Sequence, residues 1–596
     1  MGQTSVYPTG TTLYDPEKCW NGYTIYNGTG TVGAIMVDMN GKVVRHWKNF
    51  MGMPNKFFPN GHILGHRENR NGKYGFQDCA ELIEVDWDGN IVWQFNHGDY
   101  IEDPGSEPRW MARYHHDYQR EGNPVGYYVP GMEPQIDKGH TIILAHKTLY
   151  DHKISDKKLQ DDCILKVDWE GNVVWEWNCH EHFDELGFTE QMKNVLFRDP
   201  TMTGAGAGDW IHLNAIAWLG PNKWYEAGDD RFHPENIICS SREANIIFII
   251  DAASGKIVWR MGPDYSDPKY SHIGWIIGQH HVHMIPKGLP GEGNILLFDN
   301  GGWAGYGSPS EESKYGTRAV RRDHSRVLEI NPVTLDLEWQ YTKRPLEAEN
   351  PIRAHHFYSE LVSSVQRLPN GNTMICEGSD GRFMEVTKDH EVVWEYVNPY
   401  GNPGGSMIYR AYRVPYEWVP VPKPTEVPVE AIDNNRFRMP GAAPWDLSPV
   451  FEIGGCKERA KGVKSTPLAP YQQVNAEKLP HVFEIEEEKT PVLTRENKAQ
   501  FQKDCEGTVV ALFGARRCEN CKQFYPEFLK AEEKMTEKSK ASWWFVRVDA
   551  EAELAKECEV TATPTVVVWK DGSIKEKLAG VKTAEEVMEF LNKTCG

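Results

Sequence analysis

The segment Leu82-Ile-Glu-Val-Asp-Trp-Asp-Gly-Asn-Ile-Val-Trp93 has the pattern of a β-hairpin. Its alternating apolar residues predict two half-buried strands, and the Asp-Gly-Asn turn reverses the chain because glycine adopts positive φ without steric cost. Five further segments repeat this pattern and also end in Trp: residues 34–47, 164–175, 247–259, 327–339 and 383–394. The sequence therefore contains six copies of one structural unit.

Five of the six copies follow another short apolar segment that reads as a strand: residues 61–64, 139–144, 236–239, 293–298 and 371–376. The repeating unit is then an antiparallel meander of three or four strands. One meander cannot bury both of its faces, whereas six meanders stacked around an axis bury one another and remove long sheet edges. We therefore predict a mainly β fold, a six-bladed β-propeller over residues 1–418.

The pattern stops near Trp418, and residues 419–490 form a Pro-rich stretch that reads as a semi-rigid linker. Residues 491–596 follow as a small α/β module. They are expected to hold a strand at 508–514, a helix from Cys518 to about residue 535, strands at 544–549 and 563–569, a hairpin turn at 570–572 leading to a further strand, and a helix at 584–592.

This module resembles thioredoxin. In Cys518-Glu-Asn-Cys521 the helix N-terminus stabilises a thiolate, so Cys518 is the expected nucleophile and Cys521 the resolving thiol. The resemblance implies that Pro564 is the cis-proline opposite this pair. Two positions depart from the family: Leu512 replaces its buried acid, and Arg517 replaces the Trp before the first cysteine. A redox-silent docking domain is the alternative; a zinc site is weaker, since no second CxxC exists.

Composition and charge limit the partners and locations expected for the protein. The chain has 596 residues, and 65 Lys and Arg against 85 Asp and Glu give a net charge of −20, which argues against nucleic acid as a partner. No stretch of about 18 apolar residues exists, so no membrane span is expected. The N-terminus lacks the pattern of a signal peptide, so a cytoplasmic location is expected, or a periplasmic one if a signal was removed.

Histidines cluster between the repeats, before or at the innermost predicted strands. These residues are His115, His116, His212, His280, His281, His283, His355 and His356. Innermost strands of a propeller line its axial channel, so imidazoles from four blades are expected to face one axis. Their equivalent positions in the repeat indicate a shared functional site.

Most of residues 1–415 resembles the bacterial arylsulfate sulfotransferase family. The resemblance rests on these segments: Gly208-Asp-Trp-Ile-His-Leu-Asn214, Ser240-Ser-Arg242, Gln279-His280, Leu297-Phe-Asp-Asn-Gly301, Ser325-Arg-Val-Leu-Glu329 and Tyr409-Arg-Ala411. It implies a six-bladed propeller that moves a sulfuryl group between phenols through a sulfohistidine. By motif, His212 and His280 correspond to acid, base or phenol-binding groups, and Arg326 to a clamp for the anionic group.

One departure from this family affects the chemistry. The family's nucleophilic histidine lies just before the Tyr-Arg-Ala segment, where this chain has Ile408. Isoleucine cannot form the covalent intermediate. Either His356 or His281 serves as the substitute nucleophile, or the scaffold performs different chemistry.

The histidines also support a rival hypothesis, in which the eight clustered imidazoles supply ligands for copper or another transition metal. The protein would then be a metal-dependent oxidoreductase acting on aromatic or small sulfur compounds, with the dithiol module as reductant and a thioredoxin reductase-type electron donor. A binding platform without catalysis is a third alternative. We favour sulfuryl transfer on a small phenolic substrate; the sequence does not specify the oligomeric state.

Overall fold

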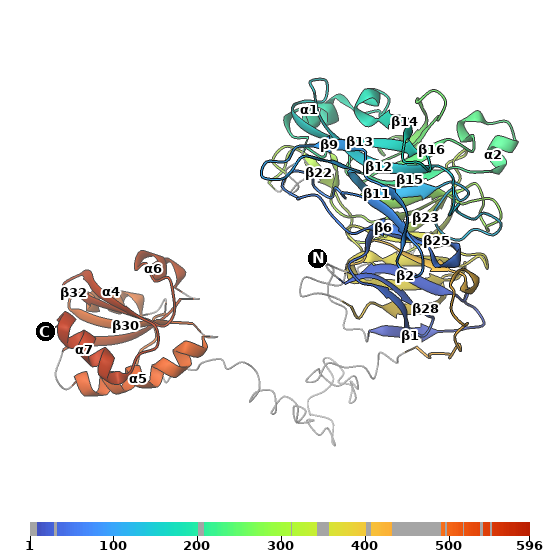
Figure 1. The fold of residues 1–596 in the computed structure, drawn as a ribbon. Helices are drawn as coiled ribbons and strands as arrows, with labels where there is room; N and C mark the ends of the chain where they lie inside the picture. Colours follow the sequence, from blue (N-terminus) through green and yellow to red (C-terminus); the bar gives the residue numbers. More distant parts are fainter. Residues whose placement is uncertain are drawn as a thin grey trace, which may run out of the picture. The chain divides into compact units, whose positions relative to one another are not determined.

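The structure is a computed structural model of the full chain. It describes residues 9–28, 32–200, 208–311, 313–342, 357–400, 407–431, 490–494, 497–515, 518–536, 540–548 and 551–595. The chain divides into two compact units, residues 1–432 and 433–596, which are described separately (Figure 1).

The first unit contains six antiparallel sheets that each match one of the six repeats; five have four strands, and the sixth has β1 (Gly10–Tyr14) as a fifth strand. In strand order, sheet 1 contains β29 (Ala411–Val414), β2 (Tyr23–Gly28), β3 (Gly33–Val37) and β4 (Val43–Trp47), and sheet 2 contains β5 (Met51–Phe57), β6 (Ile63–His66), β7 (Leu82–Val85) and β8 (Ile91–Phe95). Sheet 3 contains β11 (Tyr114–Arg120), β12 (Thr141–Asp151), β13 (Ser155–Val167) and β14 (Val173–Asn178), and sheet 4 contains β15 (Leu213–Trp218), β16 (Ile237–Ser241), β17 (Ile246–Ile250) and β18 (Ile257–Met261). Sheet 5 contains β19 (His280–Met284), β20 (Ile295–Asp299), β23 (Arg326–Ile330) and β24 (Leu337–Tyr341), and sheet 6 contains β25 (Ser364–Arg367), β26 (Thr373–Glu377), β27 (Arg382–Val386) and β28 (Val392–Val397). All six predicted hairpins are confirmed.

The first strands of the sheets contact one another in a closed order. Strand β2 touches β5, β5 touches β11, and the contacts continue through β15, β19 and β25 back to β29. The last strand, β29, pairs with β2 near the start of the chain, while β1 (Gly10–Tyr14) extends sheet 6 by pairing with β28. This closed order is the arrangement expected of a six-bladed propeller. We call this unit the six-sheet ring, and the place where its first strands meet the hub.

The beginning of the predicted linker belongs to the six-sheet ring. Backbone hydrogen bonds join Tyr14 and Val429 in both directions, at 2.8 and 3.0 Å. The hydroxyl of Tyr23 also donates to the carbonyl of Pro422 over 3.2 Å. The packed part of the chain therefore continues past Trp418 to at least residue 431, and residues 432–489 lie outside the described residues.

Three of the interfaces between neighbouring sheets contain the same buried group of Arg, Glu and Trp. The arginine ends the first strand of one sheet, and the acid and the indole lie on the third and fourth strands of the preceding sheet. The ion pairs are Arg120–Glu84 at 2.9 Å, Arg367–Glu329 at 2.6 Å and Arg413–Glu385 at 3.1 Å. Each guanidinium also lies over a Trp of that sheet: Trp93, Trp339 and Trp394 respectively. Since the glutamate occupies the same position in three repeats, the repeat itself determines how these sheets dock.

The second unit is a four-stranded sheet with helices. Its strand order is β31 (Ser542–Arg547), β30 (Thr508–Gly514), β32 (Thr565–Lys570) and β33 (Ser573–Ala579), with β30 parallel to β31 and antiparallel to β32. The helices are α4 (Lys498–Asp504), α5 (Glu519–Thr536), α6 (Ala552–Glu557) and α7 (Ala584–Cys595). The predicted elements are confirmed, with β33 as the strand that follows the expected hairpin turn; α4 and α6 are additional. No helix among the described residues has the length and apolar character needed to cross a bilayer.

The ion pair Arg413–Glu385 tests the docking of sheet 1 on sheet 6. Both side chains are fully buried, so Arg413→Leu leaves an unpaired buried carboxylate and is expected to lower the free energy of unfolding of the six-sheet ring by about 3–5 kcal/mol. The double variant Arg413→Leu/Glu385→Leu should recover most of this loss, as measured by calorimetry of the full chain. The exposed pair Lys153–Asp184 is the control, and Lys153→Met should cost less than about 1 kcal/mol. Equal losses in the single and double variants would contradict the assignment.

Candidate active site at the hub

The backbone bulges where the histidines enter the hub. Register shifts interrupt the pairing of the first strands β11, β15 and β19 with their neighbours. Within the shifts of β11 and β19, His116 and His281 adopt φ values of 52° and 51°, and His212, immediately before β15, has a φ of 48°. A left-handed backbone at a residue other than glycine costs roughly 1–3 kcal/mol and persists only where the surrounding structure holds it. Its occurrence at three histidines at or next to the first strands indicates a functional constraint at the hub.

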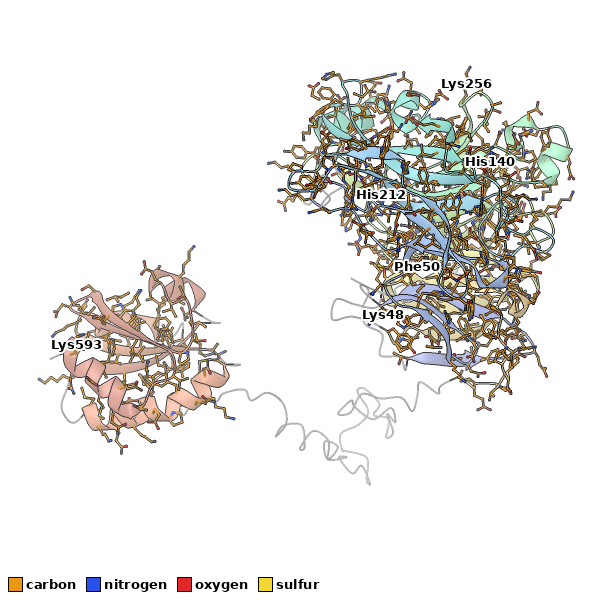
Figure 2. The ribbon with its side chains drawn as sticks, in the orientation of Figure 1. Lys48, Phe50, His140, His212, Lys256 and Lys593 are labelled. Carbon is orange, nitrogen blue, oxygen red and sulfur yellow. A yellow bond between two sulfur atoms is a disulfide. The ribbon has the colours of Figure 1, made fainter. Side chains whose placement is uncertain are left out.

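The bulges bring together residues from distant parts of the chain. The centroid of the His116 imidazole lies 4.6 Å from that of His212 and 5.5 Å from the Tyr409 ring, while the His280 imidazole lies 6.4 Å from Tyr409. We call His116, His212, His280, Tyr409 and Arg410 the hub cluster; Figure 2 labels His212 within the six-sheet ring. His116, His212, His280 and Arg410 are buried, His212 being 3% exposed, and Tyr409 is partly buried. The predicted convergence of His116, His212 and His280 on one place agrees with these distances.

Hydrogen bonds fix the orientation of two of these imidazoles. Nδ1 of His212 lies 2.6 Å from Oδ2 of Asp209, and Nδ1 of His280 lies 2.7 Å from Oδ1 of Asn300. Both partners are acceptors, so each Nδ1 carries the proton and each Nε2 keeps a lone pair when the imidazole is neutral. Within the described part of the chain, neither Nε2 has a recorded partner, so each is available to a reacting group.

The ring nitrogens of His281 and His283 instead form hydrogen bonds within the protein. The backbone N–H of Val365 donates to Nδ1 of His281 over 3.2 Å, so the proton of this imidazole is on Nε2. Nδ1 of His283 bonds the carbonyl of His281 at 2.9 Å, and its Nε2 lies 2.9 Å from the hydroxyl of Tyr127. These two side chains support the hub and do not offer it a lone pair.

Buried cations lie beside the imidazoles. Arg410 donates to Oδ2 of Asp117 at 2.9 Å and to the carbonyl of Asn214 at 2.6 Å, and Lys56 bonds the other oxygen of Asp117 at 2.8 Å. Burial opposes ionisation of Asp117, but Arg410 and Lys56 outweigh burial and hold its pKa below the usual value. The hub therefore contains two cations for one carboxylate at this point.

The two arginines near the predicted anion site differ in availability. Arg326 gives its donors to Oδ2 of Asp299 at 2.8 Å and to the carbonyls of Ile273 and Trp275 at 2.7 and 3.0 Å. Arg242 pairs with Glu243, and its backbone N–H donates to the carbonyl of His212 over 3.1 Å. The Arg242 charge is also the main influence after burial that lowers the pKa of His280. Arg242 is therefore better placed than Arg326 to act on an anion at the hub.

Of three other positions singled out in the sequence, the structure describes Ile408 but not His355 or His356. Ile408, at the family nucleophile position, is fully buried in an apolar cluster with Tyr26 and Trp394. His355 and His356 lie outside the described residues, so their roles stay predictions.

The metal-ligand set also stays a prediction. Among the described residues, the only set of three donor groups whose ligand atoms lie within 4.8 Å of one another is His115, His146 and Asp162, and only His115 belongs to the predicted set.

Several residues around the hub were missed by sequence reasoning. Asp209 lies three positions before His212 within a quoted segment, and this spacing was a usable signal. Asn300 also lies within a quoted segment, Leu297–Gly301, whereas His146 and Asp162 lie on strands β12 and β13 with no motif of their own. Only the pairing of neighbouring strands brings them to the hub.

Burial keeps the inner imidazoles neutral. Burial, reinforced by the neighbouring His212, holds the pKa of His116 well below the usual value, and burial with Arg242 does the same for His280. Burial also lowers the pKa of His115 to about 4, of His66 to about 4 and of His283 to about 3. His146 differs, because hydrogen bonds to Asp162 and Asp78 outweigh burial and raise its pKa to about 9.

These pKa values predict acid sensitivity. Unfolded histidines take up protons near pH 6.5, whereas folded His66, His115 and His283 do so only near pH 4 or below. The unfolded state therefore binds more protons as the pH falls from 6.5 to 4, and the free energy of unfolding of the six-sheet ring should fall over this range. His146 has the opposite effect: its pKa is raised to about 9, so its contribution to the free energy of unfolding is fully present below pH 6.5 and is lost as the pH rises from 6.5 through about 9.

His283→Gln should make this dependence shallower by up to one proton, measured as the slope of unfolding free energy against pH from 6.5 to 4. His152→Gln, which removes an exposed histidine, should leave the slope unchanged. Identical slopes in wild type and His283→Gln would contradict the assignment.

The redox pair lies at the start of α5. Cys518 and Cys521 form a disulfide, and Cys521 is fully buried while Cys518 is partly exposed. The backbone N–H of Cys521 and the hydroxyl of Thr563 lie 3.1 and 3.4 Å from Sγ of Cys518. The peptide bond Thr563–Pro564 is cis, as the thioredoxin resemblance implied. Cys518 is thus the sulfur that another thiol can reach, and two donors favour its thiolate.

Cys518→Ser should abolish reduction of insulin disulfides by the full chain, because no accessible thiolate is left to attack. Cys521→Ser should instead accumulate a mixed disulfide, detected by non-reducing electrophoresis and mass spectrometry. Cys505→Ser is a matched control, since burial raises the pKa of that thiol to about 11. Full reductase activity in Cys518→Ser would show that the pair is not the reactive site.

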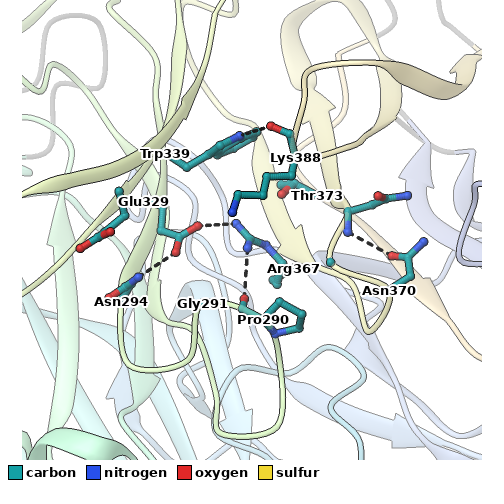
Figure 3. Close-up of a pocket in the computed structure, with 12 residues that line it drawn as sticks. Pro290, Gly291, Asn294, Glu329, Trp339, Arg367, Asn370, Thr373 and Lys388 are labelled. Carbon is teal, nitrogen blue, oxygen red and sulfur yellow. Dashed lines mark hydrogen bonds and ion pairs between the residues drawn. The ribbon is translucent and has the colours of Figure 1, made fainter.

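One pocket of about 520 Å³ lies between sheets 5 and 6 (Figure 3). Its lining includes Arg367, Glu329, Trp339, Asn294 and Lys388, and none of the predicted catalytic or metal-ligating residues. It is an opening beside one of the Arg, Glu and Trp groups described above, so we assign it to sheet docking.

Comparisons with known proteins find a matching family for each of the two units. The family model Arylsulfotransferase (ASST) matches residues 23–402, which is more than half of the chain, and the model Thioredoxin matches residues 490–593. The mitochondrial thioredoxin of Bos taurus is 35% identical over 91 residues, 15% of this chain and 54% of that protein, so the chain spans about half the length of this relative. The thioredoxin of Bacillus subtilis is 35% identical over 88 residues, 15% of this chain and 83% of that protein.

Among solved structures, mitochondrial thioredoxin 3 of Saccharomyces cerevisiae in its oxidised form is 28% identical, with 17% of this chain and 94% of that chain covered and a TM-score of 0.16. The match over residues 23–402 contains the whole hub cluster except Tyr409 and Arg410. The chain therefore belongs to the arylsulfotransferase (ASST) family and carries a thioredoxin domain at its C-terminal end.

Proposed function

We propose that the hub transfers a sulfuryl group from an aryl sulfate to an acceptor phenol. The observation that carries this proposal is the pair of imidazoles, His212 and His280, whose Nδ1 atoms are held by Asp209 and Asn300 and whose Nε2 atoms have no recorded partner among the described residues. Membership of the family supports the reaction class, and the buried arginines support binding of an anion.

We assign the nucleophile to His212. Its Nε2 lone pair attacks sulfur, the bond from sulfur to the aryl oxygen breaks, and the phenolate leaves with the electron pair. Nε2 then carries the sulfuryl group, and the positive charge that develops on the imidazole faces the carboxylate of Asp209, 2.6 Å from Nδ1. His281, the alternative expected from the sequence, has its lone pair occupied by the N–H of Val365.

In the second half of the reaction the acceptor phenol attacks sulfur and the bond from sulfur to Nε2 of His212 breaks. Nε2 of His280 accepts the phenolic proton, since Nδ1 already carries the hydrogen that it donates to Asn300 and Nε2 keeps a lone pair. This proton returns through solvent to the phenolate released first, so the cycle consumes nothing. Arg242 lies where it offsets charge on the sulfuryl oxygens. The role of the thioredoxin domain is to exchange disulfides through Cys518, on a partner that the sequence does not identify.

Stopped-flow measurement of phenol release from 4-nitrophenyl sulfate tests the assignment. Wild type should show a burst, with turnover that requires an acceptor phenol, and His212→Ala should lower the rate about 100-fold or more. Mass spectrometry of acid-quenched protein without acceptor should find the sulfuryl adduct on the peptide containing His212. His152→Gln is the control and should behave like wild type.

The outcomes distinguish failure of the proposed function from failure of the assigned nucleophile. No transfer by wild type to any phenol would overturn the proposed function. Transfer that persists in His212→Ala, with the adduct on the peptide containing His356, would keep the function and assign the nucleophile to that residue.

A further inference from the structure

Three buried donor groups converge on adjacent strands of sheet 3, next to the hub cluster. His115 lies on β11, His146 on β12 and Asp162 on β13, and each side chain is at most 1% exposed. Nε2 of His115 lies 2.9 Å from Oδ1 of Asp162, and Nε2 of His146 lies 3.4 Å from the same oxygen. The two imidazoles stack with centroids 3.5 Å apart and planes 10° from parallel, and both Nε2 atoms lie near the same oxygen of Asp162.

These separations suit a metal ion. Tetrahedral coordination with bonds of about 2.0–2.1 Å places neighbouring ligand atoms about 3.3 Å apart. The two measured distances bracket this value, but the lone pair of an imidazole lies in the plane of its ring, so one of the two stacked rings must turn before both Nε2 atoms can bind one ion.

Two of the donor atoms have no other satisfactory partner. Although Nε2 of His115 and Oδ1 of Asp162 are close, neither forms a hydrogen bond of good geometry with any described residue. The other oxygen of Asp162 is used, since it accepts the backbone N–H of Leu213 at 2.8 Å. Buried polar atoms left without a partner are costly, and a bound cation would satisfy both at once.

Surrounding residues orient the donors. Nδ1 of His146 lies 2.6 Å from Oδ1 of Asp78, and Asp78 is itself held by Arg113 at 2.8 Å and Arg70 at 3.0 Å. A carboxylate behind a ligating imidazole fixes its orientation and increases its basicity, as is usual in metal sites.

We propose that His115 Nε2, His146 Nε2 and Asp162 Oδ1 bind one divalent transition metal ion of the Zn²⁺ or Fe²⁺ class. Two imidazoles and one carboxylate are the ligands that such ions prefer, and they leave at least one coordination position for water or another group. The site does not depend on the sulfuryl-transfer proposal, because none of its three ligands belongs to the hub cluster.

Metal content of the full chain tests the site. Protein produced with added zinc or iron, and chelator-treated protein titrated with Co²⁺, should each bind one ion, and Co²⁺ should give the visible absorption of low-coordinate cobalt. Cys518→Ser/Cys521→Ser should be the background for every sample, so that the dithiol does not bind the probe. Asp162→Asn and His146→Gln should each weaken Co²⁺ binding at least about tenfold.

His180→Gln is the matched control, because His180 pairs with Asp151 at 3.1 Å in the same region and is not a proposed ligand. His212→Gln tests the hub itself and should leave binding unchanged. X-ray absorption of the loaded Cys518→Ser/Cys521→Ser protein should show nitrogen and oxygen ligands, including two imidazoles, and this measurement leaves all three proposed ligands in place.

A protein that binds no metal under either condition would overturn the proposal, and would leave His146 as an imidazolium held between Asp78 and Asp162. Sulfur in the coordination shell, or binding lost in His212→Gln but kept in Asp162→Asn, would also overturn it.

Discussion

The hub depends on the pairing of β29 with β2, which closes the six-sheet ring. Tyr409 and Arg410 immediately precede β29, so the strand that completes sheet 1 also delivers these two side chains. Arg410 then reaches Asp117, which lies 293 positions earlier in the chain, and Asn214. Since contacts of such long sequence separation form only after the intervening sheets are in place, closure of the ring and assembly of the candidate active site are one event.

The hairpins were predictable because the signal for each is local. Alternating apolar residues and a glycine turn within about a dozen residues are enough to specify two strands. The clustering of His116, His212 and His280 was also predictable, since they recur at one position of the repeat. The roles of single side chains were not, because a bulge changes which residues of a strand face the hub and breaks the alternation on which such predictions rest. Arg326 illustrates a second limit: only coordinates reveal that Asp299 and two carbonyls already use its donors.

The hub combines neutral imidazoles with buried cations. Taking a charge out of water is expensive, and Arg410 and Lys56 offset that expense by sharing Asp117. The same burial that raises this cost keeps the nearby imidazoles unprotonated, so lone pairs and fixed positive charges coexist within one small region. Nucleophilic attack on an anion requires both a lone pair to attack and positive charge to hold the anion. Ile408, to which the resemblance assigned the place of the nucleophile, packs in an apolar cluster, so the proposed chemistry rests on the side chains of the hub cluster.

The 2.7 Å separation between Nδ1 of His115 and Nδ1 of His116 has a further consequence. A neutral imidazole has a single N–H, and only one hydrogen fits between two nitrogens at this distance. Whatever occupies Nε2 of His115 therefore decides which of the two residues donates, and so whether neutral His116 carries its hydrogen on Nδ1 or on Nε2. A ligand bound at a sealed position of sheet 3 would thus set the tautomer of an imidazole of the hub cluster without any movement of the backbone.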